Sequence, residues 1–541
     1  MLHEIEWLRP HVRFIPFALC IAIAFVSVIF WAVFSSIYFW TFAAATGLSI
    51  LGAYDLIQTK HNLMRNYPIT GRLRWLSEAI RPQIRQYYIE SDIDGTPFNR
   101  NERTLVYQRA KNLQAEEPFG TDRDVYAAGY EFFLHSIAPK PPAEEAFRVT
   151  VGGPGCKRPY SMALLNVSAM SFGALSANAI RALNLGAKMG GFAHDTGEGG
   201  LASYHLENGG DLVWEIGSGY FGCRTPDGRF DPEIFKDKVN VDPVKCVSVK
   251  LSQGAKPGIG GVMPAAKVTP EIAEIRGVPV GVKCVSPANH TSFSTPRELI
   301  EFVTKLRDLA DGRPTGFKLC IGHGSEFLGI CKAMIELEVY PDFIIVDGGE
   351  GGTGAAPLEF EDHVGVPLTE GLAFAHNALV GCNLRDKIKI GCSGKIVSGF
   401  AMAQRLAVGA DYCNAARAMM FALGCVQSLK CQTNHCPTGV ATQDPRRSRA
   451  IVVPTKAERV YQFQKQTVEA FNQFIAAMGL NDPNELTPSM LVRRVDERRV
   501  LPYDEFMTFL KPGELLDGTD EPRYRKFWEE ASANTFGTGP G

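Results

Sequence analysis

The feature that most constrains this chain is a long uncharged run close to its N-terminus. From Phe14 to Tyr54, 41 residues contain no Asp, Glu, Lys, Arg or His. A single α-helix rises 1.5 Å per residue, so the run would be about 60 Å long, twice the roughly 30 Å hydrocarbon core of a bilayer. A helical hairpin that turns near Ser35 and Ser36 fits that thickness better. We therefore predict that residues 1–58 form a transmembrane helical hairpin, which contacts the membrane through residues 14–54.

Basic residues flank this run on both sides. Arg9 and Arg13 precede it, and the residues that come after it include Lys60, Arg65, Arg72, Arg74, Arg81 and Arg85. Because Lys and Arg accumulate on the cytoplasmic side of membrane proteins, both ends of the hairpin are predicted to be cytoplasmic. We expect the chain to lie in the inner (cytoplasmic) membrane with its catalytic domain facing the cytoplasm.

Two other interpretations of the run fit less well. A cleaved signal peptide would agree with the small residues at 43–45, but its apolar stretch should be only about 7 to 15 residues long. A buried core hairpin is the second, although a soluble core rarely needs so apolar a sequence.

The overall composition excludes some classes of partner. Lys plus Arg is 56 and Asp plus Glu is 58, which gives a net charge of −2. Such a chain lacks the basic footprint of a general nucleic-acid coat, so we predict no nucleic-acid partner. The thirteen Cys are an odd number scattered through a long chain, and they do not look like a disulfide framework. We interpret them as thiols in a reducing compartment.

The chain is predicted to divide further after the hairpin. Residues 59–145 are charged and punctuated by prolines, which indicates a connecting segment that packs on the domain after it, with a helix over Glu102–Ala115. Residues 481–541 are predicted to be a C-terminal extension, and the tail from Ala531 is expected to be disordered. Ahead of the extension, Ala457–Gly479 has the spacing of an amphipathic helix, with one apolar face made of Val460, Phe463, Val468, Phe471 and Ile475.

Between about residues 160 and 425, short apolar runs alternate with helical stretches. Eight runs are candidate strands: Ala163–Ala169, Phe192–Asp195, Cys246–Leu251, Val280–Cys284, Gly316–Cys320, Phe343–Val346, Ile388–Ile390 and Tyr412–Ala415. Strand–helix alternation predicts a parallel sheet with helices outside. The fold class predicted is therefore α/β, a (β/α)8 TIM barrel over residues 146–480, with the transmembrane hairpin and helical flanking segments outside it.

Six clusters of glycine or other small residues come after these candidate strands. In a (β/α)8 barrel the loops after the strands build the active site, and glycines there let the backbone approach a ligand closely. Glycines also make ordinary tight turns, but six successive clusters favour a large planar or phosphorylated ligand.

The strongest local motif is Cys425-x5-Cys431-x4-Cys436, followed by Pro437. Three thiolates within twelve residues suit iron or zinc, because both accept soft sulfur ligands. Zinc usually needs four ligands, and His435 would be an awkward fourth beside Cys436. Three buried free cysteines are the remaining alternative. Three cysteines without an obvious fourth ligand favour a 3Fe-4S cluster.

Two lysines form the second signal. Lys250 and Lys318 each lie in an otherwise apolar candidate strand, where an ammonium group is costly unless it meets an anion. At a barrel mouth such a lysine could stabilise negative charge on a reduced flavin ring. The alternative is that one or both simply pair with a structural carboxylate.

Several of these motifs together resemble one known family. Ala169-Met-Ser-Phe-Gly-Ala-Leu-Ser176, Thr196-Gly-Glu-Gly-Gly200, Gln253-Gly-Ala-Lys-Pro-Gly258, Gly351-Gly-Thr-Gly354 and the Cys loop ending in Cys-Pro-Thr-Gly-Val-Ala-Thr-Gln look like the FMN-binding synthase domain of glutamate synthase. They occur in that family's order over roughly residues 146–480. With the apolar N-terminus, the chain resembles the short, membrane-anchored branch of glutamate synthase large-subunit-like proteins.

The resemblance implies two cofactors and their binding residues. FMN would sit at the barrel mouth, beside a 3Fe-4S cluster held by Cys425, Cys431 and Cys436. The residues implied to contact FMN are Met170, Ser171, Lys250, Lys318, Gly351, Gly352, Ser393, Gly394, Ala416 and Arg417. In family terms, electrons pass from the cluster to FMN, and reduced FMN delivers hydride to 2-iminoglutarate.

The resemblance also implies catalytic residues and partners. Lys256 would hold a carboxylate of the 2-oxo acid substrate, Glu198 would orient the imine nitrogen, and Lys318 would face the flavin. The partners predicted are this small-molecule substrate and an electron donor, which could be a ferredoxin, a quinone pool or a separate reductase subunit.

One loop departs from the family pattern. Where the family usually reads Gly-Glu-Gly-Gly-Gln-Leu-Pro-Gly, this chain has Gly258-Ile-Gly-Gly-Val-Met-Pro-Ala, so that Ile259 and Val262 replace a Glu and a Gln. Losing a group that hydrogen-bonds a substrate changes which substrate fits. The alternatives that this loop motivates are a different flavin-dependent oxidoreduction of an amino acid or 2-hydroxy acid and N-alkylglutamate synthesis. A separate alternative, of another class, is a catalytically silent membrane scaffold.

Overall fold

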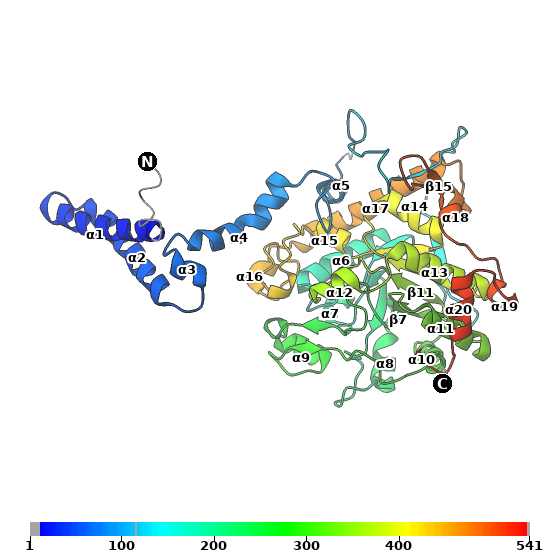
Figure 1. Cartoon of the computed structure of the whole chain (residues 1–541). Helices are drawn as coiled ribbons and strands as arrows, with labels where there is room; N and C mark the ends of the chain where they lie inside the picture. The colour runs from blue at the N-terminus through cyan, green and yellow to red at the C-terminus, as the bar shows by residue number, and fades with distance from the viewer. Residues whose placement is uncertain (1–10, 114–115, 538–541) are drawn as a thin grey trace. The chain divides into compact units, whose positions relative to one another are not determined.

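The computed structural model describes residues 11–113 and 116–537. The chain divides into two compact units, one that ends at Asn99 and one that begins at Arg100. Figure 1 colours the chain from blue at the N-terminus to red at the C-terminus. The boundary between the two compact units, after Asn99, does not test the domain boundaries predicted at residues 58 and 145. Those two boundaries stay predictions.

The N-terminal unit contains the predicted hairpin. Helices α1 (Ile15–Val33) and α2 (Tyr38–Ile57) flank a turn at Ser35 and Ser36, as the sequence indicated. Both are long and apolar enough to cross a membrane, and only 6% and 17% of their most apolar windows are buried. This exposure is unlike that of the helices in a soluble core. Trp31 and Phe39 pack across the turn with ring centroids 4.9 Å apart.

Two further helices come after the hairpin in the same unit. They are α3 (Asn62–Asn66) and α4 (Arg72–Ile84), and α4 continues into a π-helical turn, Arg85–Ile89. Asp55 of α2 is fully buried; it accepts a hydrogen bond from the Ile69 amide (3.0 Å) and pairs with the Arg72 guanidinium (2.6 Å). This contact fixes the start of α4 at the end of α2.

The second unit is built around a closed barrel of eight parallel strands, which confirms the predicted fold class (Figure 1). In barrel order the strands are β4 (Leu165–Val167), β5 (His194–Asp195), β6 (Leu212–Ile216), β7 (Val244–Lys250), β10 (Thr315–Leu319), β11 (Phe343–Asp347), β12 (Lys389–Ser393) and β13 (Tyr412–Ala415). Seven of the eight candidate strands overlap one of them.

The eighth candidate strand was wrong. Val280–Cys284 lies outside the barrel, where Val280 is 56% exposed and Gly281 has a φ of +68°, which an extended strand does not adopt. Only β9 (Cys284–Val285) forms there, and it pairs antiparallel with β8 (Val262–Met263). The missing barrel strand is β6, which the sequence pattern did not reveal.

The barrel interior is apolar at the amino-terminal ends of the strands. A core cluster there joins Ala193, Val213, Cys246, Phe343, Ile345 and Tyr412 to Val151 and Met162. The last two come from a hairpin of β2 (Arg148–Val151) and β3 (Tyr160–Ala163), which therefore closes this end of the barrel. Because side chains alternate along a strand, residues two and four positions further along also point inward.

Helices surround the barrel, as expected for this fold. The helices after the strands are α6 (Ala177–Gly190), α7 (Ser203–Leu206), α8 (Pro232–Val239), α9 (Pro270–Arg276), α10 (Pro296–Leu309), α11 (Gly324–Leu337), α12 (Leu358–His363), α13 (Leu368–Gly381), α14 (Gly399–Val408), α15 (Arg417–Leu423) and α16 (Pro445–Ser448). Helix α17 (Val453–Ala477) comes next, and all five residues predicted for its apolar face are buried.

Segments before and after the barrel pack on it. Helix α5 (Arg100–Ala110) replaces the longer helix predicted over Glu102–Ala115, whose last two residues lie outside the described residues. Strand β1 (Glu131–Phe133) pairs with the C-terminal hairpin of β14 (Leu491–Arg494) and β15 (Val500–Pro502). The last helices are α18 (Tyr503–Phe506), α19 (Glu514–Asp517) and α20 (Pro522–Glu530).

The expected disorder from Ala531 was wrong for residues 531–537. Ala533 is 3% exposed, and its carbonyl accepts a hydrogen bond from the Arg297 amide at 3.0 Å. The Lys332 ammonium group donates to the Ala531 carbonyl at 2.8 Å. Specific contacts with α10 and α11 thus order the tail, and composition alone did not show them. Residues 538–541 lie outside the described residues.

Candidate functional site

The carboxyl ends of the barrel strands carry charged side chains where the other end carries apolar ones. Asp195, Glu215, Lys250 and Asp347 lie two or four positions after inward-facing core residues of their own strands, so they point into the barrel mouth. Lys318 joins them because it is the register partner of Lys250 on the neighbouring strand. In a (β/α)8 barrel this end holds the active site.

Lys318 is ion-paired with Glu215 of β6. Their side chains are only 6% and 1% exposed. Burial by itself lowers the pKa of Lys318, but the negative charges of Glu215, Asp195 and Asp347 outweigh it and raise the pKa. Lys318 is therefore a permanent cation in the barrel interior.

Asp195 faces the same pair from β5. Burial and the neighbouring charge of Glu215 raise its pKa to about 8, although Lys318 opposes the shift. One of its oxygens accepts a hydrogen bond from the Gly197 amide at 2.9 Å. Asp195 thus binds a proton more tightly than an ordinary carboxyl group does.

Lys250 pairs with a different carboxylate, that of Glu198. Lys250 Nζ lies 3.0 Å from Glu198 Oε1 and also donates to the Gln253 side chain. Burial by itself would raise the pKa of Glu198, but Lys250, Arg276 and Lys256 outweigh it and lower the pKa to about 2. Glu198 is therefore ionised throughout the physiological range.

Lys256 completes the charged group. It is 2% exposed, and its Nζ donates to the Ala355 carbonyl at 3.0 Å. Burial and repulsion from Lys250 lower its pKa to about 8, against the attraction of Glu198. The predicted catalytic residues Glu198 and Lys256 are thus brought within electrostatic range of each other.

The predicted flavin-contacting loop after β4 packs tightly on the Glu198 loop. A Cβ atom added at Gly197, where φ is +63°, would lie 2.8 Å from the Ser171 amide nitrogen and 3.1 Å from the Met170 carbonyl carbon. Met170 is 7% exposed. The buried guanidinium of Arg276 donates to the Phe172 carbonyl at 3.2 Å, which ties the loop to α9.

The other residues that the resemblance implies as FMN contacts come from three neighbouring loops, after β11, β12 and β13. Arg417 donates to the Glu350 carbonyl at 2.9 Å, and a Cβ atom added at Gly352 would lie 2.8 Å from its Nη1 atom. The Ser393 hydroxyl donates to Asp347, so it is held inside the barrel. The remaining predicted residues of these loops are Gly351, Gly394 and Ala416, and Gly394 has a φ of +155°.

The three cysteines lie on the segment after α15 and influence one another. Burial raises the pKa of Cys425 to about 12, and Cys431 and Cys436 add to the rise. Burial also raises the pKa of Cys431. At Cys436 burial acts in the same direction, but hydrogen bonds with residues 438–441 outweigh it and lower the pKa. Within residues 11–113 and 116–537, however, no three His, Cys, Asp or Glu side chains are grouped as a formed metal site.

The cysteine loop is bound to the proposed flavin side of the barrel. Ser176, after the Met170 loop, donates its hydroxyl to the Gly439 carbonyl at 2.8 Å. Gln443 donates to the Gly173 and Leu175 carbonyls at 3.0 and 2.8 Å. A Cβ atom added at Gly354 would lie 3.7 Å from the Cβ atom of Cys431. The glycine-rich loop after β11 therefore reaches the cysteines.

The residues present fit the chemistry of both predicted cofactors. The thiols of Cys425, Cys431 and Cys436 are soft donors, which suit an iron–sulfur cluster. Burial lowers the pKa of Lys267, which lies close enough to Cys431 and Cys436 that their negative charges oppose this shift. Arg417 and its glycine-rich neighbours suit a phosphate group.

Sequence reasoning missed several residues of the site. Glu215 and Asp195 share the signal that identified the lysines, because each is a lone charge in an otherwise apolar strand. Lys267 and Arg276 lie outside the strands and gave no such signal. His290 links the Tyr220 hydroxyl (3.0 Å) to the Lys250 carbonyl (2.9 Å), and burial lowers its pKa to about 4, so it is a neutral support of the Lys250 strand end.

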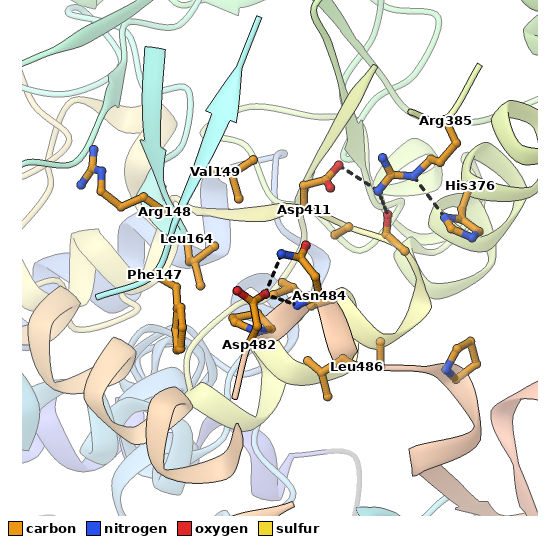
Figure 2. A pocket seen from close by; sticks show the side chains of 16 residues that line it. Phe147, Arg148, Val149, Leu164, His376, Arg385, Asp411, Asp482, Asn484 and Leu486 are labelled. Atoms are coloured by element: carbon orange, nitrogen blue, oxygen red, sulfur yellow. Dashed lines mark hydrogen bonds and ion pairs between the residues drawn. The ribbon is translucent and has the colours of Figure 1, made fainter. Parts of the chain in front are cut away.

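A separate cavity of about 290 Å³ lies at the opposite end of the barrel (Figure 2). Its walls include Leu164, which directly precedes β4, and Asp411, which directly precedes β13. Figure 2 shows Arg385 bound to both Asp411 and His376. Because active sites in this fold form at the carboxyl ends of the strands, the charged mouth is the candidate site.

Comparisons with known proteins identify the family of this chain. A family model described as a conserved region in glutamate synthase matches residues 157–481, more than half of the chain. The glutamate synthase large subunit-like protein YerD of Bacillus subtilis is 36% identical over 494 residues, which cover 84% of this chain and 94% of that protein.

Two further matches are more distant. An archaeal-type glutamate synthase (NADPH) of Thermotoga neapolitana is 31% identical over 315 residues, which are 58% of this chain and 59% of that enzyme. The match thus spans about three fifths of its length. Among solved structures, a mandelate oxidase with (S)-2-phenylpropionate is 14% identical with a TM-score of 0.38, covering 70% of this chain and 94% of that one.

Proposed function

Because the chain belongs to the glutamate synthase family and is a glutamate synthase-like oxidoreductase, we propose that it uses FMN and a 3Fe-4S cluster to reduce 2-iminoglutarate, or a related 2-oxo acid imine, to an amino acid. The observation that carries the proposal is the pairing of Lys250 with Glu198 and of Lys318 with Glu215 at one barrel mouth. This arrangement holds two fixed cations and an ionised carboxylate where the fold binds substrates.

Lys256 and Glu198 are proposed to bind the substrate. Protonated Lys256 attracts a substrate carboxylate, while the Glu198 carboxylate accepts a hydrogen bond from the imine N–H group. Glu198 is held in place because Gly217 and Gly261 pack against its side chain, where any larger residue would collide with it. The ion pair with Lys250 keeps Glu198 ionised, so it is a permanent acceptor rather than a proton donor.

Lys250 and Lys318 are proposed to face the polar edge of FMN. Bound FMN would supply hydride-transfer chemistry, and the cluster would supply single electrons. Met170, Ser171, Gly351 and Gly352 would support the ring, while the loops of Ser393, Gly394, Ala416 and Arg417 would hold the phosphate. Glu215 keeps Lys318 charged and oriented. Glu215 is therefore a positioning residue.

The cluster ligands are proposed to be Cys425, Cys431 and Cys436, and iron content tests them. Cys431→Ala should lose most of the iron while retaining much of the flavin, because the flavin contacts come from other loops. Cys156→Ser is the matched control, since the Cys156 thiol donates to the Gly312 carbonyl in another part of the barrel. Full iron content in Cys431→Ala would remove the ligand assignment.

The chain is also proposed to be anchored in the inner membrane by residues 14–54, with the barrel in the cytoplasm. The exposed apolar helices α1 and α2 support this location. A ferredoxin or a reductase subunit would then deliver electrons from the cytoplasmic side. Domain boundaries at residues 58, 145 and 480 are part of the same proposal.

Anaerobic turnover by the full-length protein in detergent tests the reaction. The assay supplies 2-oxoglutarate, ammonium and reduced methyl viologen, and chiral chromatography measures glutamate. Glutamate formation, together with a flavin spectrum, supports the proposal. A colourless protein that lacks iron would instead support the silent scaffold.

A second candidate is the same chemistry on a different substrate. Gly261 packs directly against Glu198, so the segment that carries Ile259 and Val262 lies at the edge of the proposed substrate site. The apolar side chains there favour a substrate with an apolar group in place of a polar one. Methylamine in place of ammonium in the same assay tests N-alkylglutamate synthesis. A 2-hydroxy acid supplied with an oxidised dye as electron acceptor, in place of 2-oxoglutarate and reduced methyl viologen, tests hydroxy-acid oxidation.

A further inference from the structure

Helix α4 and the turn after it carry an exposed apolar stripe. Leu73, Leu76, Ile80, Ile84 and Tyr87 are spaced by three, four, four and three residues, which places them on one face. They are 60%, 59%, 45%, 40% and 56% exposed. Five large apolar side chains on a single exposed helix face indicate a surface that is covered in the functional protein.

Positive charge runs beside this stripe. Arg74, Arg81 and Arg85 are spaced by seven and four residues, so they form a second row along one flank of the apolar face. Over residues 72–89 there are four Arg and one Glu. Arg81 lies 3.9 Å from Glu78 with both side chains more than half exposed, and such a pair is weak and exchanges readily for other anions. Arg85 pairs at 2.9 Å with Glu90, which is only 12% exposed, while the Arg85 side chain itself is 57% exposed, so Arg85 keeps an exposed side beside this partner.

The contacts of α4 place it beside the hairpin. The buried Asp55–Arg72 ion pair holds the first turn of α4 at the end of α2, and Trp75 packs edge-on against His61 with centroids 5.3 Å apart. Trp75, Tyr87 and Tyr88 are aromatic residues of the kind that gather at the lipid headgroup layer. If α2 ends at the membrane surface, α4 therefore begins there.

We propose that α4 and the turn to Ile89 lie in the surface of an anionic bilayer, with the Leu73–Tyr87 stripe among the acyl chains and the arginine row on lipid phosphates. An apolar face with a flanking basic row is the pattern of interfacial helices. The anionic cytoplasmic leaflet attracts such clusters. The inference rests on the proposed anchor, and it adds to that anchor a second membrane contact that depends on lipid composition.

Hydrogen exchange on the full-length protein tests this contact. The protein is placed in nanodiscs of phosphatidylcholine alone, in nanodiscs with about 30% phosphatidylglycerol, and in detergent. Backbone amides of residues 72–89 should exchange roughly tenfold slower in the anionic discs than in the neutral ones. Equal exchange in both discs overturns the inference, because a contact with lipid phosphates requires stronger protection in the anionic discs.

Two pairs of variants distinguish the contribution of the apolar stripe from that of the arginine row. Ile80→Asp should abolish the protection, whereas Ala79→Asp, its exposed neighbour outside the stripe, should retain most of it. Arg81→Ala with Arg85→Ala should remove the difference between the two lipids, and the exposed Arg498→Ala should not. Protection that survives Ile80→Asp would contradict the proposed orientation.

Carbonate extraction of membranes distinguishes failure of the anchor from failure of this inference. A chain that resists carbonate, but whose α4 exchanges equally in both lipids, keeps the anchor and overturns the inference. A chain released by carbonate loses the anchor, and binding of that released chain to phosphatidylglycerol vesicles through α4 would still support the inference. Absence of such binding would overturn both.

Discussion

Lys250 and Lys318 are register partners on the adjacent strands β7 and β10, yet they pair with different carboxylates. Lys250 turns to Glu198 in the loop after β5, and Lys318 turns to Glu215 within β6. Each ammonium group therefore has its own counter-ion, which lets two cations stand side by side inside the barrel. Both lysines therefore pair with a carboxylate, which was the alternative to a flavin contact. Such pairing is compatible with a role of the same lysines at the flavin edge.

Replacing Glu198 tests the proposed contact with the imine nitrogen. Glu198→Gln should lower kcat/KM by roughly 100-fold or more, because a neutral amide no longer attracts the imine cation and Lys250 loses its charged partner. Steady-state kinetics with reduced methyl viologen measure the effect. Glu233→Gln, on the exposed first turn of α8, is the matched control. Unchanged kcat/KM in Glu198→Gln would exclude this role.

The Glu215–Lys318 pair should behave as a buried, coupled unit. Glu215→Gln and Lys318→Met should each lower the free energy of unfolding by about 3–5 kcal/mol, because each leaves one buried charge without its partner. The double variant should cost clearly less than the sum of the two. Thermal unfolding in detergent measures this, with Glu207→Gln of the surface pair Arg181–Glu207 as control. Additive losses would mean that the two side chains are not coupled.

Lys256 gives a pH dependence with a defined sign. Its pKa is lowered to about 8, so the side chain is protonated below that pH and becomes neutral as the pH rises through it. Since only the cation attracts a carboxylate, kcat/KM for the 2-oxo acid should fall as the pH rises above about 8. Lys256→Arg should move this fall to higher pH, because arginine stays protonated. An identical profile in that variant would assign the fall to another group.

The same shift also affects stability. A lysine whose folded pKa lies below its unfolded value near 10.4 destabilises the fold at neutral pH, and this cost disappears as the pH rises from about 8 to 10. Lys256→Met should therefore be more stable relative to the wild type at pH 7 than at pH 10. Chemical unfolding at both pH values measures the difference. The same relative stability at both values would contradict the lowered pKa.

The contact between Gly254 and Gly348 is a test of backbone packing. A Cβ atom added at Gly254 would collide with the Gly348 carbonyl oxygen, so Gly254→Ala must separate the loops after β7 and β11. We expect a loss of about 1–3 kcal/mol in the free energy of unfolding, together with weaker flavin retention. Gly322→Ala, in the loop after β10, has open space around the added atom and is the control. Wild-type stability in Gly254→Ala would show that the loops tolerate separation.

Local sequence pattern determined much of this protein. The uncharged run and its serine turn predicted the hairpin, and strand–helix alternation with glycine-rich loops predicted the barrel. The apolar face of α17 came from helical spacing alone. These features depend on the periodicity of side chains along one segment, so they are readable without knowing what the segment contacts.

Tertiary structure decided the partners of the charged residues. The sequence shows Glu215 as a lone carboxylate in a strand that was overlooked. Only the pairing of β6 and β10 on either side of β7 brings it to Lys318, about a hundred residues away in the chain. The exposed Val280 segment failed as a barrel strand because strand propensity does not reveal whether a neighbouring strand is available. The order of the tail after Ala531 was also not visible in the sequence, because its hydrogen bonds come from α10 and α11, which are distant along the chain. The stability of a contact between residues far apart in the sequence depends on which surfaces of the folded chain meet. A short stretch of sequence does not show which surfaces those are.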